Sequence, residues 1–388
     1  MELYCDGERV YVSRNYRVEG LSKKELLESS EHKVVWQSGR LSETPKMLTS
    51  TRYYLLGAGH SKLIRMNKRS GEVIELEVGN EIKDIAIDLR NVFSLTAEGL
   101  YRVNIERFTE AEVVRIPISD LLEKPLKSLA LVGKSLYVLG GNLIYKISRD
   151  GELISQRVLS EGLKVLPDYE GCVVIRRGEL IYLTENLDVL SSGSFDGDFI
   201  KAEHGAYHTF LLTDRSFGVY GKTGKRYAHV EDAHYLSFAE GLNHIYFLKE
   251  RETLDYSGKK DLLGDNFSEI DLTTLVAIIM ASLMLLERKG RHVLIKKEKG
   301  YIDIQIDGKV IFLEDVILAL SRYFPEVFYL YRNPGYYEEI ELFAQRFDLF
   351  KVVGKDIRLN SELLERLLET HSGFKVFGED MVRSLLLL

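Results

Sequence analysis

The sequence predicts a mainly β protein built from repeated four-stranded antiparallel sheets, followed by a small C-terminal α/β (α+β) domain. Two observations indicate the repeated part: a hairpin pattern that returns at a nearly constant interval, and the Gly, Asn and Asp residues that punctuate it. A change of pattern near Asp271 indicates the second domain. We therefore expect two domains, residues 1–270 and 271–388, which suits a chain of 388 residues.

The repeat is clearest at the first apolar residue in the leading strand of each hairpin. These positions are Leu63, Leu100, Leu143, Leu180, Phe217 and Leu254. The successive intervals are 37, 43, 37, 37 and 37 residues. The one longer interval contains an extended turn, IERFTEAE, and an additional polar segment, DLLEKP. A single repeating unit with one insertion explains all of these spacings.

Each unit has four short strands. Residues 142–159, NLIYKISRDGELISQRVL, show the central hairpin, with a turn at Arg149-Asp150-Gly151 between two strands of alternating apolar residues. Gly, Asn and Asp tolerate the positive φ angles that such turns require. Four strands in roughly 40 residues match one blade of a β-propeller, in which each sheet covers the apolar face of its neighbour.

The N-terminal segment forms a more divergent unit, RVYVS, YRVEG, KVVWQS and KMLTS, interrupted by an expected helix in SKKELLESSE. With it, we count seven blades over residues 1–274. Six or eight blades remain open, because the first and last blades of a propeller often complete one another. The leading segment MELYC is a candidate for such a closing strand.

These repeats resemble β-propellers as a class, over about two thirds of the chain. Residues 200–221, IKAEHGAYHTFLLTDRSFGVYG, look like one repeat of the regulator-of-chromosome-condensation family. The segment GELIYL and its counterparts are similar to the loosely patterned quinoprotein-like propellers. No quinone-binding residues can be matched, so we expect no cofactor. The Trp-Asp dipeptide of WD repeats does not occur, since the only tryptophan, Trp36, precedes Gln.

The charge distribution bears on the class of partner. The net charge is −7, and residues 275–388 contain 16 Lys and Arg against 17 Asp and Glu. Subtraction from the totals of 52 and 59 leaves 36 against 42 for residues 1–274. Neither part is basic, which disfavours nucleic acid as a partner. We expect the partner to be another protein or a second subunit.

The sequence also predicts a cytoplasmic protein. The longest apolar run, residues 275–286, is about a dozen residues long, whereas crossing a bilayer takes about 20. The start, MELYCDGERV, lacks a basic and apolar leader, and we expect Cys5 and Cys172 to be reduced thiols. No membrane association is therefore expected. Only four glutamines occur, a bias that fits a thermophile.

The C-terminal part has a mixed pattern. It begins with a strongly apolar helix, LTTLVAIIMASLMLLERKG, for which Gly290 is the expected C-cap. Strands are then expected in HVLIKKE, YIDIQI and KVIFLE, followed by a helix in DVILALSRYF. The remaining segments are expected to form a strand in EVFYLYR, a turn at Asn333-Pro334-Gly335, a helix in YYEEIELFAQRF, a strand in FKVVG and a helix in NSELLERLLETH.

The order of helix, three strands, helix and strand is similar to the core of the PD-(D/E)xK nucleases, which include Holliday-junction resolvases. The resemblance implies that Asp303 matches the first metal-binding acid and Glu314 the second, with Glu287 on the preceding helix. The family's lysine position holds Val316 here, which argues against nuclease activity. The alternative is that Asp303 flanks a strand and Glu314 ends one.

Four histidines of one region are candidate metal ligands, namely His204, His208, His229 and His234. His204 and His208 are four residues apart, and on a strand such residues share a face but lie roughly 13 Å apart, too far to bind one ion. His229 and His234 are five residues apart, so on a continuous strand they would point to opposite faces. Ligands from different strands could still converge, but we expect these histidines to be ordinary blade residues.

The remaining candidates are surface groups for partner binding. They are Tyr329, Tyr331, Arg332, Tyr336 and Tyr337, and the terminal Leu385, Leu386, Leu387 and Leu388. The alternative is that the tyrosines reflect β-propensity and core packing, and that the leucines pack on the core of their own domain. We predict a non-catalytic protein-interaction scaffold, with the propeller as a rigid platform and the α/β domain recruiting a partner. The alternatives are a nucleic-acid-processing factor with an inactive or weak nuclease-like domain, and an enzyme with its site at the propeller tunnel.

Overall fold

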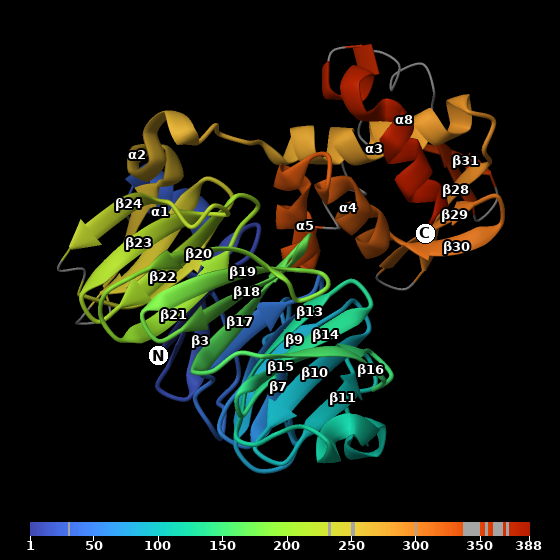
Figure 1. Cartoon of the computed structure of the whole chain (residues 1–388). Coiled ribbons are helices and arrows are strands. Elements are labelled where there is room, and N and C mark those ends of the chain that lie inside the picture. Colours follow the sequence, from blue (N-terminus) through green and yellow to red (C-terminus); the bar gives the residue numbers. More distant parts are fainter. Residues whose placement is uncertain are drawn as a thin grey trace. The chain divides into compact units, whose positions relative to one another are not determined.

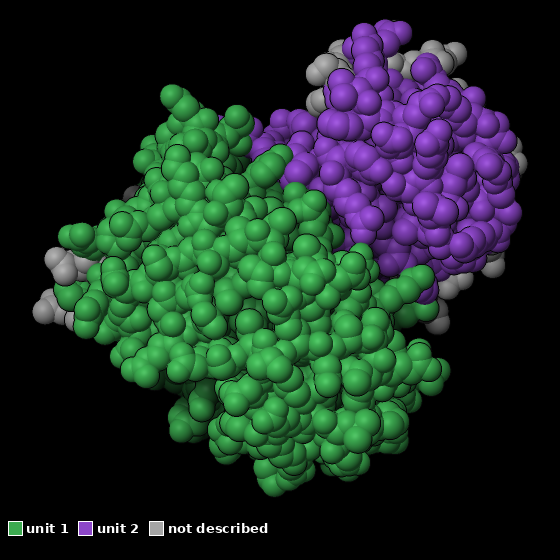
Figure 2. Space-filling model, viewed as in Figure 1, with its two compact units in different colours: residues 1–268 green, residues 269–388 purple. Residues whose placement is uncertain are grey.

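The chain divides into two compact units. The computed structural model describes residues 1–29, 32–231, 234–249, 253–298, 301–336, 350–353, 356–359, 368–369 and 372–388. Unit 1 comprises residues 1–268 and unit 2 residues 269–388, coloured green and purple in Figure 2. No described helix is long and apolar enough to cross a membrane.

Unit 1 is a β-propeller. Its described residues form seven antiparallel sheets, each built from strands that are consecutive in the chain (Figure 1). We number these sheets as blades 1 to 7. Blades 1 to 3 consist of β1 (Glu2–Cys5), β2 (Arg9–Arg14), β3 (Arg17–Ser22) and β4 (Val34–Gln37); β5 (Met47–Ser50), β6 (Tyr54–Ala58), β7 (Lys62–Asn67) and β8 (Val73–Glu77); and β9 (Ile82–Ile87), β10 (Asn91–Thr96), β11 (Leu100–Asn104) and β12 (Val114–Arg115).

The other four blades follow the same order. Blades 4 and 5 consist of β13 (Leu126–Val132), β14 (Ser135–Gly140), β15 (Leu143–Ser148) and β16 (Leu153–Val158), and of β17 (Gly162–Asp168), β18 (Gly171–Arg176), β19 (Glu179–Thr184) and β20 (Val189–Ser194). Blades 6 and 7 consist of β21 (Phe199–His204), β22 (His208–Thr213), β23 (Ser216–Gly221) and β24 (Arg226–Glu231), and of β25 (Tyr235–Glu240), β26 (His244–Lys249) and β27 (Leu254–Gly258).

Short helices lie between and after these strands. They are α1 (Lys23–Ser29) in blade 1, the 3-10 helices η1 (Glu110–Glu112) and η2 (Pro117–Asp120) around β12, and α2 (Lys259–Leu263) and η4 (Gly264–Asn266) after β27. The helix predicted in the SKKELLESSE insertion is therefore confirmed as α1. Its buried Leu26 packs with Leu254 of blade 7, and the Tyr256 hydroxyl donates to the Leu27 carbonyl.

The first strands of the blades form a closed ring. Each contacts the first strand of the next blade, from β1 through β5, β9, β13, β17 and β21 to β25, and β25 contacts β1. The segment MELYC was a candidate closing strand of the last blade, and this prediction is wrong. It forms β1, which pairs with β2 as the innermost strand of blade 1. The ring therefore closes by packing between blades 7 and 1.

Neighbouring blades share apolar cores, as the repeat requires. Alternate residues of a strand point to opposite faces, so each middle strand supplies two interfaces. In β18, Cys172 and Val174 pack toward blade 4, whereas Val173 and Ile175 pack toward blade 6. A buried cluster of this kind lies between each pair of neighbouring blades in the described part of unit 1. The two cysteines are free and buried.

Unit 2 is a small mixed domain. Its elements are α3 (Leu272–Arg288), β28 (Val293–Glu298), β29 (Tyr301–Ile306), β30 (Lys309–Phe312), α4 (Leu313–Ser321), η5 (Pro325–Val327), α5 (Phe328–Arg332), η6 (Pro334–Tyr336), β31 (Phe350–Val353), β32 (Asp356–Leu359) and α8 (Ser372–Leu386). The strands form one sheet in the order β30-β29-β28-β32-β31. Helix α3 begins at an Asp271 cap and ends before Gly290, whose φ is +81°.

The predicted strand EVFYLYR is wrong. Residues 325–332 form η5 and α5, because Pro325 opens a helical turn and three consecutive residues, Phe328, Tyr329 and Leu330, are buried together. The segment after them is the helical turn η6 rather than a simple turn. The helices predicted in 336–347 and 360–371 lie almost entirely outside the described residues.

Candidate functional site

The innermost strands of blades 3 to 7 have a polar residue at one repeated position. In blades 3 to 7 a β-bulge inserts one extra residue near the start of the strand. The inserted residues are Lys83, Lys127, Leu163, Ile200 and Leu236. The residues that follow them are Asp84, Ser128, Lys164, Lys201 and Ser237. We call this second set the polar ring.

One half of the polar ring ties blades 3, 4 and 5 together. The Asp84 carboxylate lies 2.6 Å from the Lys164 ammonium and accepts a hydrogen bond of 2.6 Å from the Ser128 hydroxyl. It also accepts from the Leu129 N–H at 2.9 Å, and the Val165 N–H donates to the Ser128 hydroxyl at 3.1 Å. Lys164 therefore reaches past blade 4 to an acid on blade 3.

The other half joins blades 6, 7 and 1 in the same way. The Lys201 ammonium contacts the Glu2 carboxylate, and it donates to the Leu3 carbonyl at 2.7 Å. The Leu3 N–H in turn donates to the Ser237 hydroxyl at 3.4 Å. Burial alone would lower the pKa of Lys201, but attraction to Glu2 and Glu203 outweighs it and raises that pKa. These contacts of Lys201 and Ser237 with β1 join blades 6 and 7 to blade 1. The polar ring therefore helps to close the propeller, which has no strand exchanged between its first and last blades.

The inserted residues form the rim beside this polar ring. Leu163, Ile200 and Leu236 occupy equivalent bulges on blades 5, 6 and 7, whose innermost strands contact one another. Their exposed fractions are 40%, 42% and 39%. Blades 3 and 4 have lysines at the same position, Lys83 and Lys127. We call the three exposed aliphatic residues the apolar crescent.

The opposite ends of the innermost strands carry acid–base latches between blades. In three blade pairs, an aspartate at the end of the first strand or directly after it meets a cation from the turn before the fourth strand of the next blade. These pairs are Asp6 with Lys68 at 2.7 Å, Asp88 with Arg149 at 3.1 Å, and Asp168 with Lys222 at 2.8 Å. They lie between blades 1 and 2, blades 3 and 4, and blades 5 and 6. Every second interface from blade 1 to blade 6 therefore carries one of these ion pairs.

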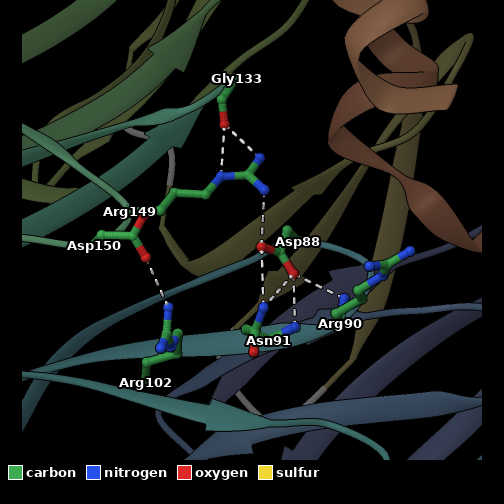
Figure 3. Close-up of polar contacts among 7 residues, drawn as sticks. All are labelled: Asp88, Arg90, Asn91, Arg102, Gly133, Arg149 and Asp150. Carbon is green, nitrogen blue, oxygen red and sulfur yellow. Dashed lines mark hydrogen bonds and ion pairs between the residues drawn. The ribbon is translucent and has the colours of Figure 1, made fainter. Parts of the chain in front are cut away.

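Figure 3 shows the latch between blades 3 and 4. One Asp88 oxygen accepts the N–H groups of Arg90 and Asn91, at 2.7 and 2.6 Å, and the other faces the Arg149 guanidinium. Arg149 also donates to the Gly133 carbonyl. Arg149 belongs to the predicted turn of residues 142–159, where Gly151 has a φ of +95°. The turn residues thus hold two blades together as well as reversing the chain.

The latch at Asp6 predicts a loss of stability in acid. Burial alone would raise the pKa of Asp6, but Lys68 and other donors lower it to about 2. The carboxylate therefore stabilises the fold above its unfolded pKa near 4, by about 2 kcal/mol, and this contribution disappears as the pH falls toward 2. We expect Asp6→Asn to have a lower Tm than the natural protein at pH 6, with the gap closing toward pH 2. A constant gap would contradict this assignment.

The four candidate histidines do not converge. His204 is fully buried, with its Nε2 3.2 Å from Asp168 and its Nδ1 2.8 Å from the Thr209 hydroxyl. His208 is buried beside the Tyr227 ring, His229 lies 3.7 Å from Glu231, and His234 is exposed. Within the described ranges, no group of three or more His, Cys, Asp or Glu side chains could hold a metal ion.

The three acids suggested by the nuclease resemblance lie on different kinds of element. Asp303 is buried in the middle of β29, where it pairs with Phe312 of β30. The prediction that Glu314 ends a strand is wrong, because it lies in the first turn of α4 and is buried there. Glu287 is half-buried near the end of α3. The acids therefore come from a strand and two helices.

The predicted tyrosine patch of unit 2 is largely internal. Tyr329 and Tyr336 are 3% and 5% exposed, and their hydroxyls lie 3.3 Å apart. For these two residues the structure agrees with core packing, the alternative to an exposed recognition patch. Tyr331 and Arg332 are half-buried. Tyr337 lies outside the described residues.

The terminal leucines divide between core and surface. Leu385 is fully buried on α8, and Leu388 is half-buried. Leu386 and Leu387 are 36% and 85% exposed. Helix α8 packs against α3 and α4, which accounts for the buried member of the set.

The polar ring and the apolar crescent were missed at the level of sequence. A signal was present, because polar residues recur in the apolar segments IKDIAI, LKSLAL and FIKAEH at nearly the spacing of the repeat. What the spacing could not supply was the bulge, which moves the preceding residue onto the exposed rim.

Comparison with known proteins adds a relative and a fold. An uncharacterized protein of Aquifex aeolicus (strain VF5) is 52% identical over 387 residues, covering 100% of this chain and 97% of the relative. The chain belongs to the same family as this Aquifex protein. No family model matches the sequence.

Solved structures share the propeller at low identity. The WD40 domain of Neurospora crassa Pan2 matches with a TM-score of 0.53 and 6% identity, covering 66% of this chain and 89% of that one. A structure of BBS1N in complex with ARL6DN matches with 0.53 and 13%, covering 66% and 90%. A chain of the Mitotic Checkpoint Complex matches with 0.53 and 11%, covering 66% and 85%. These likenesses confirm the β-propeller prediction for unit 1.

Proposed function

We propose that this chain is a non-catalytic protein-binding scaffold, and that the apolar crescent of unit 1 is its docking surface. The observation that carries the proposal is the repetition of an exposed aliphatic residue at one position of three adjacent blades. Exposed apolar residues gathered in this way are typical of surfaces that bind other proteins. A single exposed leucine would need no such explanation.

The chemistry of the rim also indicates the kind of partner. It changes from aliphatic residues in blades 5 to 7 to Lys83 and Lys127 in blades 3 and 4. A complementary segment would present apolar side chains beside an acidic one. The excess of acids in unit 1 as a whole disfavours a polyanionic partner such as nucleic acid.

The structural arrangement supports a rigid platform. The polar ring connects blades that are not neighbours, and the latches connect neighbouring blades. The strands that carry the crescent are therefore held by contacts with the blades around them. Rigid presentation reduces the entropy that a partner loses on binding. Among structures of this fold, BBS1N is seen in complex with ARL6DN, and another chain belongs to the Mitotic Checkpoint Complex.

The proposal is tested by placing a charge in the crescent. Affinity purification with crosslinking from the producing cell is expected to recover a protein partner with the natural chain. Ile200→Glu is expected to lose that partner, because a buried carboxylate would meet apolar surface. The matched control is Ile154→Glu on β16, a 52% exposed isoleucine outside the crescent, which is expected to retain it.

Two results would contradict the proposal. One is recovery of the same partner with Ile200→Glu and with Leu236→Glu at the yield of the natural protein. The other is that no specific partner is recovered with the natural protein. Circular dichroism and Tm of each variant establish that the fold is retained before binding is compared.

A further inference from the structure

Blade 7 is one strand short. The other six sheets of unit 1 have four strands, whereas β25, β26 and β27 form a sheet of three in the described residues. After β27 the chain turns into α2, which contacts β24 of blade 6 rather than extending blade 7. In the other six blades a fourth strand pairs with the outer edge of the third strand. The corresponding edge of β27 has no such strand in the described residues.

The exposure of β27 reflects this difference. In the third strands of blades 4 and 5, Ile144 and Ile181 are 0% and 5% exposed. In β27 only Leu254 is buried, and the following residues through Gly258 are half-exposed. The third strand of blade 7 thus carries more half-exposed residues than its counterparts in blades 4 and 5.

The hydrogen-bond register shows which backbone groups face the edge. The Lys249 N–H donates to the Thr253 carbonyl at 2.9 Å, and the Lys259 N–H donates to the Asn243 carbonyl at 2.8 Å. Bonded and non-bonded pairs alternate between antiparallel strands. Because Tyr246 pairs with Tyr256, three residues from the Lys249–Thr253 pair, the backbone N–H and C=O groups of Leu254 and Tyr256 point away from β26.

At this edge the Asp255 carboxylate accepts a backbone hydrogen bond that a fourth strand would otherwise accept. The Tyr256 N–H donates to Asp255 Oδ1 at 2.9 Å, and the other Asp255 oxygen lies 2.6 Å from the Lys249 ammonium. Hydrogen bonding with Lys249 lowers the pKa of Asp255, so it stays charged. In the described part of the chain, no backbone hydrogen bond reaches the outward groups of Leu254 or Tyr256.

We propose that the open edge of β27 binds an extended segment of a partner protein, which adds to blade 7 as its fourth strand. The inference rests on the proposed scaffold function and names a second mode of docking. Outward N–H and C=O groups on a strand are complementary to another extended backbone, and this geometry selects a strand over a helix or a nucleic acid. The segment runs antiparallel to β27, as the fourth strands of the other blades do.

The fourth strands of the chain itself provide a defined probe. A synthetic peptide of residues 187–195, LDVLSSGSF, contains β20 of blade 5 and carries a single charged side chain, Asp188. Its control contains Ser191→Pro and Gly193→Pro, which remove the two N–H donors that face the third strand in the register of blade 5. Binding to the full chain is measured by fluorescence anisotropy, and hydrogen exchange is followed at the amides of Leu254 and Tyr256.

We expect the β20 peptide to bind and to slow exchange at Leu254 and Tyr256, and we expect the proline peptide to do neither. Asp255→Ala removes the group that occupies the Tyr256 N–H and is expected to bind the peptide about fivefold more tightly. Lys249→Ala breaks the same ion pair but keeps the carboxylate in place, so it is expected to bring no such gain.

Three outcomes would overturn the inference. The first is that the amides of Leu254 and Tyr256 in the unbound chain already exchange as slowly as those of Ile144 and Leu180, which pair with the fourth strands of blades 4 and 5. That would mean that a segment of this chain covers the edge. The second is no protection at these amides with either the natural chain or Asp255→Ala. The third is protection by self-association, which would make a second copy the occupant. Ile200→Glu must leave peptide binding unchanged, so failure here and failure of the crescent are distinguishable.

Discussion

Replacing Lys164 with methionine is expected to lower the free energy of unfolding of unit 1 by about 3 kcal/mol. The Asp84 side chain is only 4% exposed and loses its cation, while the Ser128 hydroxyl and the Leu129 N–H remain as donors. A charge left in such a position is more costly than the loss of the pair itself. Lys164 is 29% exposed, which places the effect at the lower end for a buried pair.

Urea unfolding followed by Trp36 fluorescence measures this effect. Trp36 is the only tryptophan and is buried in blade 1, so its signal reports unit 1. The matched control is Lys127→Met, a lysine of the same rim that donates to the Gly141 carbonyl at 3.0 Å. Because it leaves no buried carboxylate behind, its effect is expected to stay within about 0.5 kcal/mol.

A double variant separates the ion pair from the hydrogen bonds. Combining Lys164→Met with Asp84→Asn removes the buried charge while keeping a side-chain acceptor for Ser128 and Leu129. Much of the lost stability is expected to return in this variant, because the uncompensated charge is the main cost. Equal effects of Lys164→Met and Lys127→Met would contradict a role for the polar ring in closing the propeller.

The propeller could be predicted because its cause is visible in the order of residues. A sheet with two apolar faces must be covered on both, and the interval of 37 residues records how often the chain solves that problem. Within a single strand, Val173 and Val174 show the same requirement, because each packs against a different neighbouring blade. Local pattern and tertiary packing agree throughout these blades.

The closure of the ring could not be predicted in this way. Both a first strand of blade 1 and a last strand of blade 7 read as an apolar segment, so MELYC was compatible with either. What decides between them is the pairing with β2 and the contact of Lys201 with Glu2, which joins residues 199 positions apart. Such long-range contacts have no periodic signature.

The error at EVFYLYR has a different origin. A short run of aromatic and aliphatic residues suits a buried strand or a buried helix equally well, and its length does not separate them. Tertiary burial of Phe328 and Leu330, with Pro325 at the start, selects the helix. Glu314 was misplaced for a related reason, because the helix α4 begins at Leu313, earlier than its apolar pattern suggested.

Mild acid is expected to destabilise unit 1 through His208 by up to about 3 kcal/mol between pH 6.5 and pH 4. Burial lowers the pKa of His208, and the positive charges of Lys259 and His204 lower it further, to about 4, with Glu240 opposing them. The imidazole is only 8% exposed and lies between the rings of Tyr207, Phe210 and Tyr227. Its neutral form is therefore the one that the fold accommodates.

The direction follows from which state binds the proton first. Above pH 6.5 the imidazole is neutral in both the folded and the unfolded chain, so it adds no pH dependence. As the pH falls, the unfolded chain takes up the proton near pH 6.5 while the folded chain resists until about pH 4, and the difference favours unfolding. Below pH 4 both states are protonated and the loss reaches its limit.

Comparison with His208→Phe isolates this contribution from other acid-sensitive groups. The phenyl ring keeps the aromatic packing but cannot be protonated, so the variant is expected to lose less stability than the natural protein between pH 6.5 and pH 4. His229→Phe is the matched control, since His229 is partly exposed beside Glu231, and it is expected to retain the natural pH dependence. Urea unfolding at half-unit steps of pH measures all three proteins. Parallel stability curves for the natural protein and His208→Phe would show that the imidazole of His208 is protonated in the folded state as readily as in the unfolded one, contrary to its burial.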